Sequence, residues 1–279
     1  MRQIRSRSKR GRYGRPLLRS VSRSPTGVTT QMTIPDSFGR GSTLGIMQPY
    51  FFPYWGHFSL IFATECWIVF DVTQYTPKSW MSRNRILHPT RGWQYLSVPI
   101  SNVSRSIRTH QALVKDPAGA RDTMVRKLEH YRKKAPFFDA TIQVLSQAFD
   151  DVKDDSLVAL DVSALCTVCR YLDISFDYRI CSQMPLDLPD KMDPGQWAPE
   201  IAKRLGAAHY VNPESGRELF DARDFAAGNV KLSFLSPAEF EYLTPGYTFE
   251  PNLSILDAMM WNEPAVIRDV VSSHYILKA

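Results

Sequence analysis

The sequence predicts an α/β domain with a mostly parallel sheet of βαβ units and a central helical insertion. Apolar runs of strand length at 43–47 and 66–70 flank a helical pattern at 57–65, which is the order of a βαβ unit. The run at 66–70 is apolar at successive positions, as expected for a strand covered on both faces of a parallel sheet. Strand and helix patterns alternate again toward the C-terminus.

Further strand patterns cover residues 93–100 and 175–181. The segment between them, 118–172, has no strand pattern and is predicted to form two or three helices, with Pro136 separating the first from the second. These helices are the predicted insertion, with a lid as the alternative. The elements expected after them are a helix at 197–207, strands at 209–211 and 230–235, a turn at 212–216, and a helix at 254–262 with Asn252 or Ser254 as its N-cap.

Residues 1–40 are predicted to be a basic, disordered tail outside the domain, which occupies residues 41–279. The tail holds ten basic side chains and one acidic side chain, with almost no periodic apolar residues. Such a segment buries too little surface to offset the entropy of ordering it. Three interpretations stay open: a mis-assigned start codon with initiation near Met32, an arm that touches RNA or a membrane, and an organelle transit peptide.

The basic charge of the chain belongs to this tail. Of 34 basic and 28 acidic side chains, residues 41–279 keep 24 and 27, a net charge of −3. A nucleic-acid partner is therefore not expected except through the tail. No apolar run approaches the roughly 20 residues that cross a bilayer, so no membrane span is predicted.

The four cysteines are predicted to be buried thiols of a cytoplasmic protein. Cys166 and Cys169 have CxxC spacing, but they lie in an apolar helical pattern, and no second pair at metal-binding spacing exists. The other two, Cys66 and Cys181, stand alone. No metal ligands are predicted, and the sequence assigns no cofactor.

The aromatic segment after the first strand is the strongest local signal for a site. It places Gln48, Tyr50, Tyr54, Gly56 and His57 between a strand end and a helix start, where ligands bind in open α/β sheets. Residues 54–57 (YWGH) resemble a degenerate HxGH signature of nucleotidylyltransferases, with tyrosine in place of the first histidine. In the alternative interpretation the aromatic residues are core and the histidine is a capping or surface residue.

A second candidate cluster follows the second strand. Asp71 closes that strand, and the next fourteen residues hold cations, aromatic rings and an amide. Such groups suit a phosphate, a carboxylate or a sugar. We expect the cluster to lie beside the first loop, although a solvated, charged loop is the alternative. Its candidate residues are Asp71, Lys78, Trp80, Arg83, Asn84 and Arg85.

Two further features are weaker. Tyr210 lies in the predicted strand at 209–211 and Asn212 follows it, and both are predicted to reach the same sheet edge, although the sequence there also suits a plain turn. Asp257 stands among apolar residues in the predicted helix at 254–262. A buried carboxylate needs a partner, so we expect an arginine beside it.

Taken in order, the segments IMQPYFFPYWGHFSLI, VFDVTQYTPKSWMSRNRI, WQYLSVPI, YRKKAPFF, RLGAAHYVNPESGRELF and LSILDAMMWN resemble the WbqC-like family of bacterial proteins. The resemblance runs from about Leu44 to Asn262. Asp71, Lys78, Arg83 and Asn84 match the family pattern. The resemblance implies a link to surface-polysaccharide and O-antigen gene clusters, in which amino sugars are built on nucleotide carriers.

The function that the resemblance implies is a transferase of surface-polysaccharide or amino-sugar biosynthesis. The step would be acyl or aminoacyl transfer with a nucleotide-linked or activated small molecule. Asp71, Lys78 and His57 are the candidate catalytic residues, acting as base or neutralising charge. The alternative is a non-catalytic module that binds a nucleotide-sugar or glycan intermediate. The candidate substrate-binding residues are Gln48, Tyr50, Tyr54, Gly56, Trp80, Arg83, Asn84, Arg85, Tyr210 and Asn212.

Overall fold

The computed structural model of the chain describes residues 37–104 and 106–279, so the predicted tail up to residue 36 lies outside the described residues. The strands are β1 (Thr43–Met47), β2 (Cys66–Val69), β3 (Arg83–Leu87), β4 (Trp93–Ser97), β5 (Tyr178–Ile180), β6 (His209–Pro213), β7 (Lys231–Pro237) and β8 (His274–Lys278). The α-helices are α1 (Trp55–Phe62), α2 (Pro117–Leu128), α3 (Phe138–Asp150), α4 (Leu157–Tyr171), α5 (Trp197–Leu205), α6 (Ala222–Ala226), α7 (Ile255–Trp261) and α8 (Pro264–Ser272).

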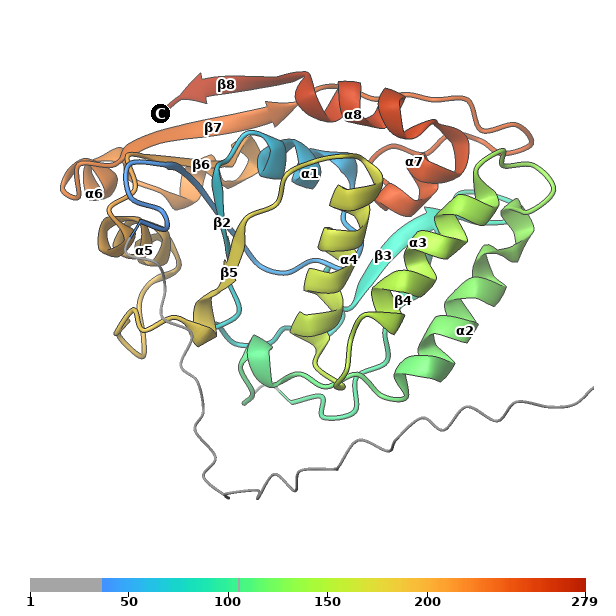
Figure 1. Cartoon of the computed structure of the whole chain (residues 1–279), viewed down its shortest axis with the longest axis horizontal. Helices are drawn as coiled ribbons and strands as arrows, with labels where there is room; N and C mark the ends of the chain where they lie inside the picture. Colours follow the sequence, from blue (N-terminus) through green and yellow to red (C-terminus); the bar gives the residue numbers. More distant parts are fainter. Residues whose placement is uncertain (1–36, 105) are drawn as a thin grey trace, which may run out of the picture. The chain divides into compact units, whose positions relative to one another are not determined.

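The main sheet has the strand order β5-β2-β1-β6-β7-β8 (Figure 1). Neighbouring strands are parallel from β5 through β7, and β8 alone pairs antiparallel, against β7. The predicted α/β fold with a mostly parallel sheet is therefore confirmed. The unit β1-α1-β2 is the βαβ unit that the first two apolar runs predict.

Successive residues of a strand point to opposite faces of the sheet, and apolar side chains are buried on both faces. Leu44 and Ile46 of β1 pack in one core cluster with Ile201 of α5. Gly45, between them, faces the ring of Trp67 so closely that a Cβ atom would lie 2.6 Å from it. Phe38, within the predicted tail, is buried in the same cluster as α5.

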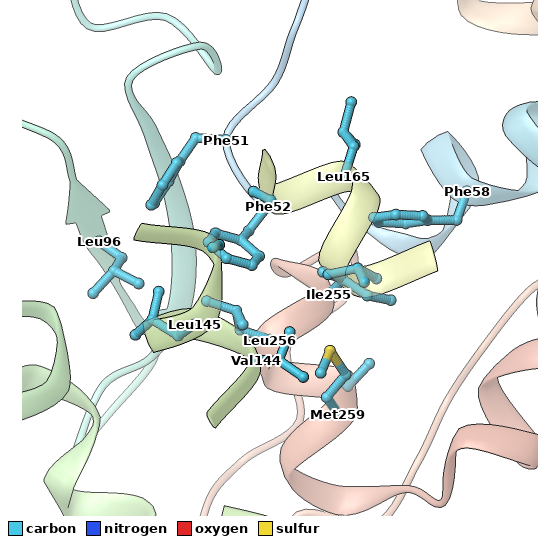
Figure 2. Packing of buried hydrophobic residues seen from close by; sticks show 14 of the residues in the cluster. Phe51, Phe52, Phe58, Leu96, Val144, Leu145, Leu165, Ile255, Leu256 and Met259 are labelled. Carbon is cyan, nitrogen blue, oxygen red and sulfur yellow. The ribbon is translucent and has the colours of Figure 1, made fainter. Parts of the chain in front are cut away.

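A helical lobe of α2, α3, α4 and α7 packs around the two-stranded sheet β3–β4 (Figure 1). Figure 2 shows its core, where Phe51 and Phe52 from the loop after β1 meet Leu145 of α3 and Ile255 and Met259 of α7. The helices predicted between residues 118 and 172 are present as α2, α3 and α4. Because Phe51 and Phe52 are buried in this lobe, the loop that follows β1 is held in a fixed position.

Some elements differ from the prediction. Residues 83–87 form a strand that the sequence reading missed, and β4 pairs with it in a separate sheet. The expected turn at 212–216 begins later, because β6 continues to Pro213 and a 3-10 helix follows at Glu214–Leu219. Beyond α7, for which Ser254 is the N-cap, the chain adds α8 and β8, which were not predicted. Among the helices described, none is both long and apolar enough to span a membrane.

Candidate functional site

The site lies at the topological switch point of the sheet, where the strand order reverses. From β1 the chain proceeds to β2 and β5 on one side, whereas β6 and β7 lie on the other. In open α/β sheets, ligands bind at the carboxyl ends of the strands beside such a switch point. A cavity of about 930 Å³ opens there, at the ends of β1, β2 and β6. Its volume falls within the roughly 300–1,000 Å³ typical of small-molecule sites.

The cavity wall combines aromatic rings with uncharged polar groups. Phe70 and Trp197 meet edge to face, with ring centroids 5.5 Å apart. The uncharged polar groups are the amides of Gln48, Gln74 and Asn212 and the hydroxyls of Tyr50, Thr73, Ser106 and Tyr210. The complete wall is formed by Ile46, Met47, Gln48, Tyr50, Phe70, Val72, Thr73, Gln74, Ser106, Ile107, Arg108, Asp190, Lys191, Met192, Pro194, Trp197, Ala198, Tyr210, Asn212, Leu219 and Phe220.

The loop after β1 supplies Gln48 and Tyr50 to the wall. The sequence predicts this position, because the loop follows the carboxyl end of the strand. Gln48 Nε2 donates to the Thr73 hydroxyl at 3.3 Å, which links the loops that follow β1 and β2. Tyr54 and Gly56 do not line the cavity. They pack on each other, since a Cβ atom on Gly56 would lie 2.5 Å from the Tyr54 ring.

His57 lies behind the cavity wall, buried in α1. Its ring packs on Tyr50 and Trp67, with centroids 5.6 and 5.2 Å away. Its Nε2 atom has no hydrogen-bond partner among the described residues. Burial lowers the pKa of His57 to about 3, so the ring is neutral at physiological pH. The alternative interpretation of His57 as a capping or surface residue is wrong, because the side chain is buried and Tyr54 is the N-cap of α1.

Tyr210 and Asn212 both line the cavity from β6, and they are held together. The Tyr210 hydroxyl donates to Asn212 Oδ1 at 2.9 Å, and Asn212 Nδ2 donates to the Pro213 carbonyl at 3.0 Å. Gly216 closes over this amide, because a Cβ atom there would lie 2.4 Å from Nδ2. The amide is thereby fixed in one orientation at the strand end.

Charged side chains sit at the edge of the cavity. Arg108 Nη2 lies 3.5 Å from Asp190 Oδ1, and this ion pair joins two loops that are distant in sequence. Lys191 adds a second cation next to it. Asp190 is the sole carboxylate among the described residues of the wall, and its side chain is 97% exposed. The edge therefore carries net positive charge above a neutral interior.

Asp71 follows β2 but does not line the cavity. Its carboxylate accepts the backbone N–H of Ser182 at 2.8 Å and the Ser182 hydroxyl at 2.6 Å. Burial raises the pKa of Asp71, and the two bonds from Ser182 oppose that rise. The carboxylate thus ties the end of β2 to the segment after β5.

The rest of the second cluster lies apart from the cavity, because its residues belong to β3 or to the turn before it. The two loops are adjacent, as expected, since the Phe51 N–H donates to the Trp80 carbonyl at 2.9 Å. Of the second cluster, however, only residues 72–74 reach the cavity wall. Lys78 is exposed in a left-handed conformation with φ 57°. Asn84 is buried and donates to the carbonyls of Phe51 and Phe52 at 3.0 and 2.9 Å. Trp80, Arg83 and Arg85 form a surface on the hairpin that is described below.

The buried carboxylate of Asp257 is paired, but the expectation of an arginine partner is wrong. Its oxygens accept hydrogen bonds from the phenols of Tyr131 and Tyr242, the latter at 2.8 Å. Burial raises the pKa of Asp257 to about 6, and the phenol bonds oppose that rise. Phenols satisfy a buried carboxylate without bringing a second charge into the core.

Sequence reasoning missed several wall residues, notably Arg108, Trp197 and Phe220. Trp197 reads as the first residue of an amphipathic helix, which hides its place at the cavity. Arg108 stands in a segment without a strand or helix pattern. No local signal predicts that it meets Asp190 far along the chain.

All four cysteines are free, and Cys66, Cys169 and Cys181 are buried. Burial raises the pKa of the Cys181 thiol to about 12. Within residues 37–104 and 106–279, no three His, Cys, Asp or Glu side chains converge as metal ligands would.

Comparison with known proteins agrees with the resemblance seen in the sequence. The model of the WbqC-like protein family matches residues 48–269. An uncharacterized protein of Mycobacterium tuberculosis (strain ATCC 25618 / H37Rv), Rv1507c, is 26% identical over 219 residues, which cover 77% of this chain and 92% of the relative. No solved structure matches the chain. The match covers most of the domain, including the strand-end loops that form the cavity, and the chain belongs to the WbqC-like protein family.

Proposed function

We propose that the cavity binds a nucleotide-linked sugar and that the chain is a transferase of surface-polysaccharide or amino-sugar biosynthesis. The observation that carries the proposal is the combination of fixed amides with aromatic rings at the switch point of the sheet. Sugar hydroxyls both donate and accept hydrogen bonds. A side-chain amide such as that of Gln48 or Asn212 can accept through its oxygen and donate through its NH2 group. The apolar face of a sugar or a base packs on rings such as Trp197.

The charged edge of the cavity supports a phosphorylated ligand. Arg108 and Lys191 stand at the opening, and a guanidinium pairs with phosphate through two parallel hydrogen bonds. Only Asp190 opposes them, and a ligand phosphate would compete with it for Arg108. In the proposed pose the phosphates lie at this edge and the sugar or base lies against the interior amides.

The transferred group is proposed to be an acyl or aminoacyl group, passed from an activated donor to the amine of an amino sugar. The new amide bond forms as the donor's leaving group departs, and the amine releases a proton. The four free thiols support a reducing compartment, and we propose the cytoplasm.

A second candidate function is a non-catalytic module that binds the same ligand. It is favoured by the positions of Asp71, Lys78 and His57, none of which lines the cavity. Asp190 is exposed and paired with Arg108, so the described wall offers no buried carboxylate as a general base.

The test is a thermal-shift screen of the full chain against UDP- and dTDP-sugars, ATP, CTP, acyl-CoA and amino acids, with and without magnesium. A ligand at 100 times its dissociation constant stabilises the folded state by about 2.7 kcal/mol. We expect a shift with a nucleotide-linked sugar, and weaker binding in the double variant Gln48→Ala/Arg108→Gln. Arg121→Gln is the matched control, because Arg121 on α2 pairs with Asp122 and with Asp150 of α3, and none of these residues lines the cavity. No shift with any nucleotide-linked sugar would contradict the proposal.

The two candidate functions are then separated by turnover. The bound sugar is incubated with acyl-CoA or an activated amino acid, and the products are analysed by mass spectrometry. Acylated sugar that is absent without protein supports the transferase. Tight binding without product from any donor of the panel supports the binding module.

A further inference from the structure

The hairpin β3–β4 carries a surface that is separate from the cavity. In the antiparallel register Arg85 lies opposite Tyr95, and Leu87 lies opposite Trp93. Residues two apart on a strand share a face, so Arg83 and Arg85 stand on the same face as these two rings. Asn84, Ile86 and Leu96 turn inward to the helical lobe, where they are buried. We call the outer side, with Trp80 from the preceding turn, the hairpin face.

Cations and aromatic rings alternate on the hairpin face. Arg83 lies over the Tyr95 ring at 3.9 Å. Arg85 lies near the rings of Trp80 and Trp93, at 5.6 and 5.2 Å from their centroids. The two indoles remain 42% and 39% exposed, although tryptophan is highly buried on average in folded proteins. They are therefore available to a partner.

The two arginines have no carboxylate partner among the described residues, whereas Arg121, Arg132 and Arg204 each form an ion pair. Arg85 donates instead to the Asn252 carbonyl at 3.1 Å. Lys127 adds a cation beside them, with its Nζ bonded to the Tyr95 carbonyl at 2.7 Å. The hairpin face thus holds positive charge that is oriented but not neutralised.

We propose that the hairpin face binds an acidic glycan, that is, a sugar chain bearing carboxylate or phosphate groups. A guanidinium recognises such an acid through paired hydrogen bonds. The exposed indoles offer flat apolar surfaces on which the C–H face of a sugar ring packs. In the biosynthetic role proposed above, this surface would hold a growing chain or acceptor, and to that extent the inference rests on the proposed function.

A single-stranded nucleic acid also combines phosphate with flat rings, but the charge favours the glycan. Three cations stand on a domain whose residues 41–279 carry a net charge of −3. Nucleic-acid binding draws most of its strength from neutralising many phosphates, about six to ten in typical proteins. Three cations suit one or two acids within a short stretch of sugar chain.

The test measures binding of the full chain to defined hexasaccharides by tryptophan fluorescence. The probes are hexagalacturonic acid, a phosphorylated mannohexaose, neutral mannohexaose and a six-nucleotide single strand. The first two separate a carboxylate from a phosphate ligand. We expect at least one of them to bind and the neutral sugar and the oligonucleotide to bind at least about tenfold more weakly.

Variants locate the surface. Arg85→Gln and Trp93→Ala are each expected to weaken acidic-glycan binding by about tenfold, whereas Arg121→Gln leaves it unchanged. Failure of every acidic probe, equal binding in the hairpin variants, or a preference for the oligonucleotide that is lost in the hairpin variants would overturn the inference. The nucleotide-sugar shift reports the cavity independently. If that shift is absent while Trp93→Ala still weakens glycan binding, the proposed function falls and this inference stands.

Discussion

Ser182 donates two hydrogen bonds to the buried carboxylate of Asp71, one from its backbone N–H at 2.8 Å and one from its hydroxyl at 2.6 Å. The pair connects the end of β2 to the 3-10 turn at Cys181–Gln183, which follows β5. Asp71 is also a candidate catalytic base from sequence, and that role stays a prediction. The geometry gives it a structural role that can be measured separately.

We predict that Ser182→Ala destabilises the chain by about 1–2 kcal/mol, because it leaves a buried carboxylate with one fewer donor. Asp71→Ala should cost about 3 kcal/mol, and the double variant should cost less than the sum. Urea denaturation measures all three. Strictly additive losses would show that the contact contributes no coupling energy.

His57 predicts a loss of stability in mild acid. Its pKa is about 3 in the folded state and about 6.5 in the unfolded state. Below pH 6.5 the unfolded chain therefore takes up a proton that the folded chain refuses, and stability falls as the pH falls. Between pH 7 and pH 5 this amounts to about 2 kcal/mol. The difference in unfolding free energy between wild type and His57→Phe should change by that amount, and a constant difference would contradict the assignment.

Asp257 predicts the opposite trend. Its pKa is about 6 when folded and 3.8 as the ordinary value. Between these values the folded chain holds the extra proton, so its contribution to stability rises as the pH falls. From pH 7 to pH 5 the gain is about 1 kcal/mol. The difference in unfolding free energy between wild type and Asp257→Asn should grow by that amount from pH 7 to pH 5, and a difference that stays constant would contradict the assignment.

Gly216 predicts a binding defect from a small change. A Cβ atom there would lie 2.4 Å from Asn212 Nδ2, so Gly216→Ala must displace the amide from its fixed position in the cavity wall. We expect sugar binding to weaken by about three- to tenfold, as for loss of one neutral hydrogen bond, while the chain stays folded. Ser215→Ala, at the neighbouring exposed position, is the control. Equal affinities in both variants would remove Asn212 from the binding surface.

The fold and the position of the site follow from local patterns in the sequence. The apolar runs at 43–47 and 66–70 are short and flank one helix, which specifies a parallel pair, and parallel strands bring their carboxyl ends to one edge. This is why Gln48, Tyr50, Tyr210 and Asn212 line the cavity.

The remaining wall depends on contacts that no local pattern encodes. Arg108 and Asp190 meet only because two loops cross at the edge of the cavity. Conversely, the cations at 83–85 suggest a site loop. They instead alternate with the buried residues Asn84 and Ile86, as a strand of a half-buried hairpin requires. Buried and half-buried residues do alternate along this strand, but the half-buried positions are arginines and one buried position is the polar Asn84, so the segment does not look like a strand in the sequence.

The most direct test of the central claim is titration calorimetry of UDP- and dTDP-sugars against three forms of the full chain. These are the wild type, Gln48→Ala/Arg108→Gln in the cavity, and Arg83→Gln on the hairpin face. We predict that a nucleotide-linked sugar binds wild type and Arg83→Gln alike and binds the cavity variant at least about tenfold more weakly. Loss of binding in Arg83→Gln with full affinity in the cavity variant would contradict the account.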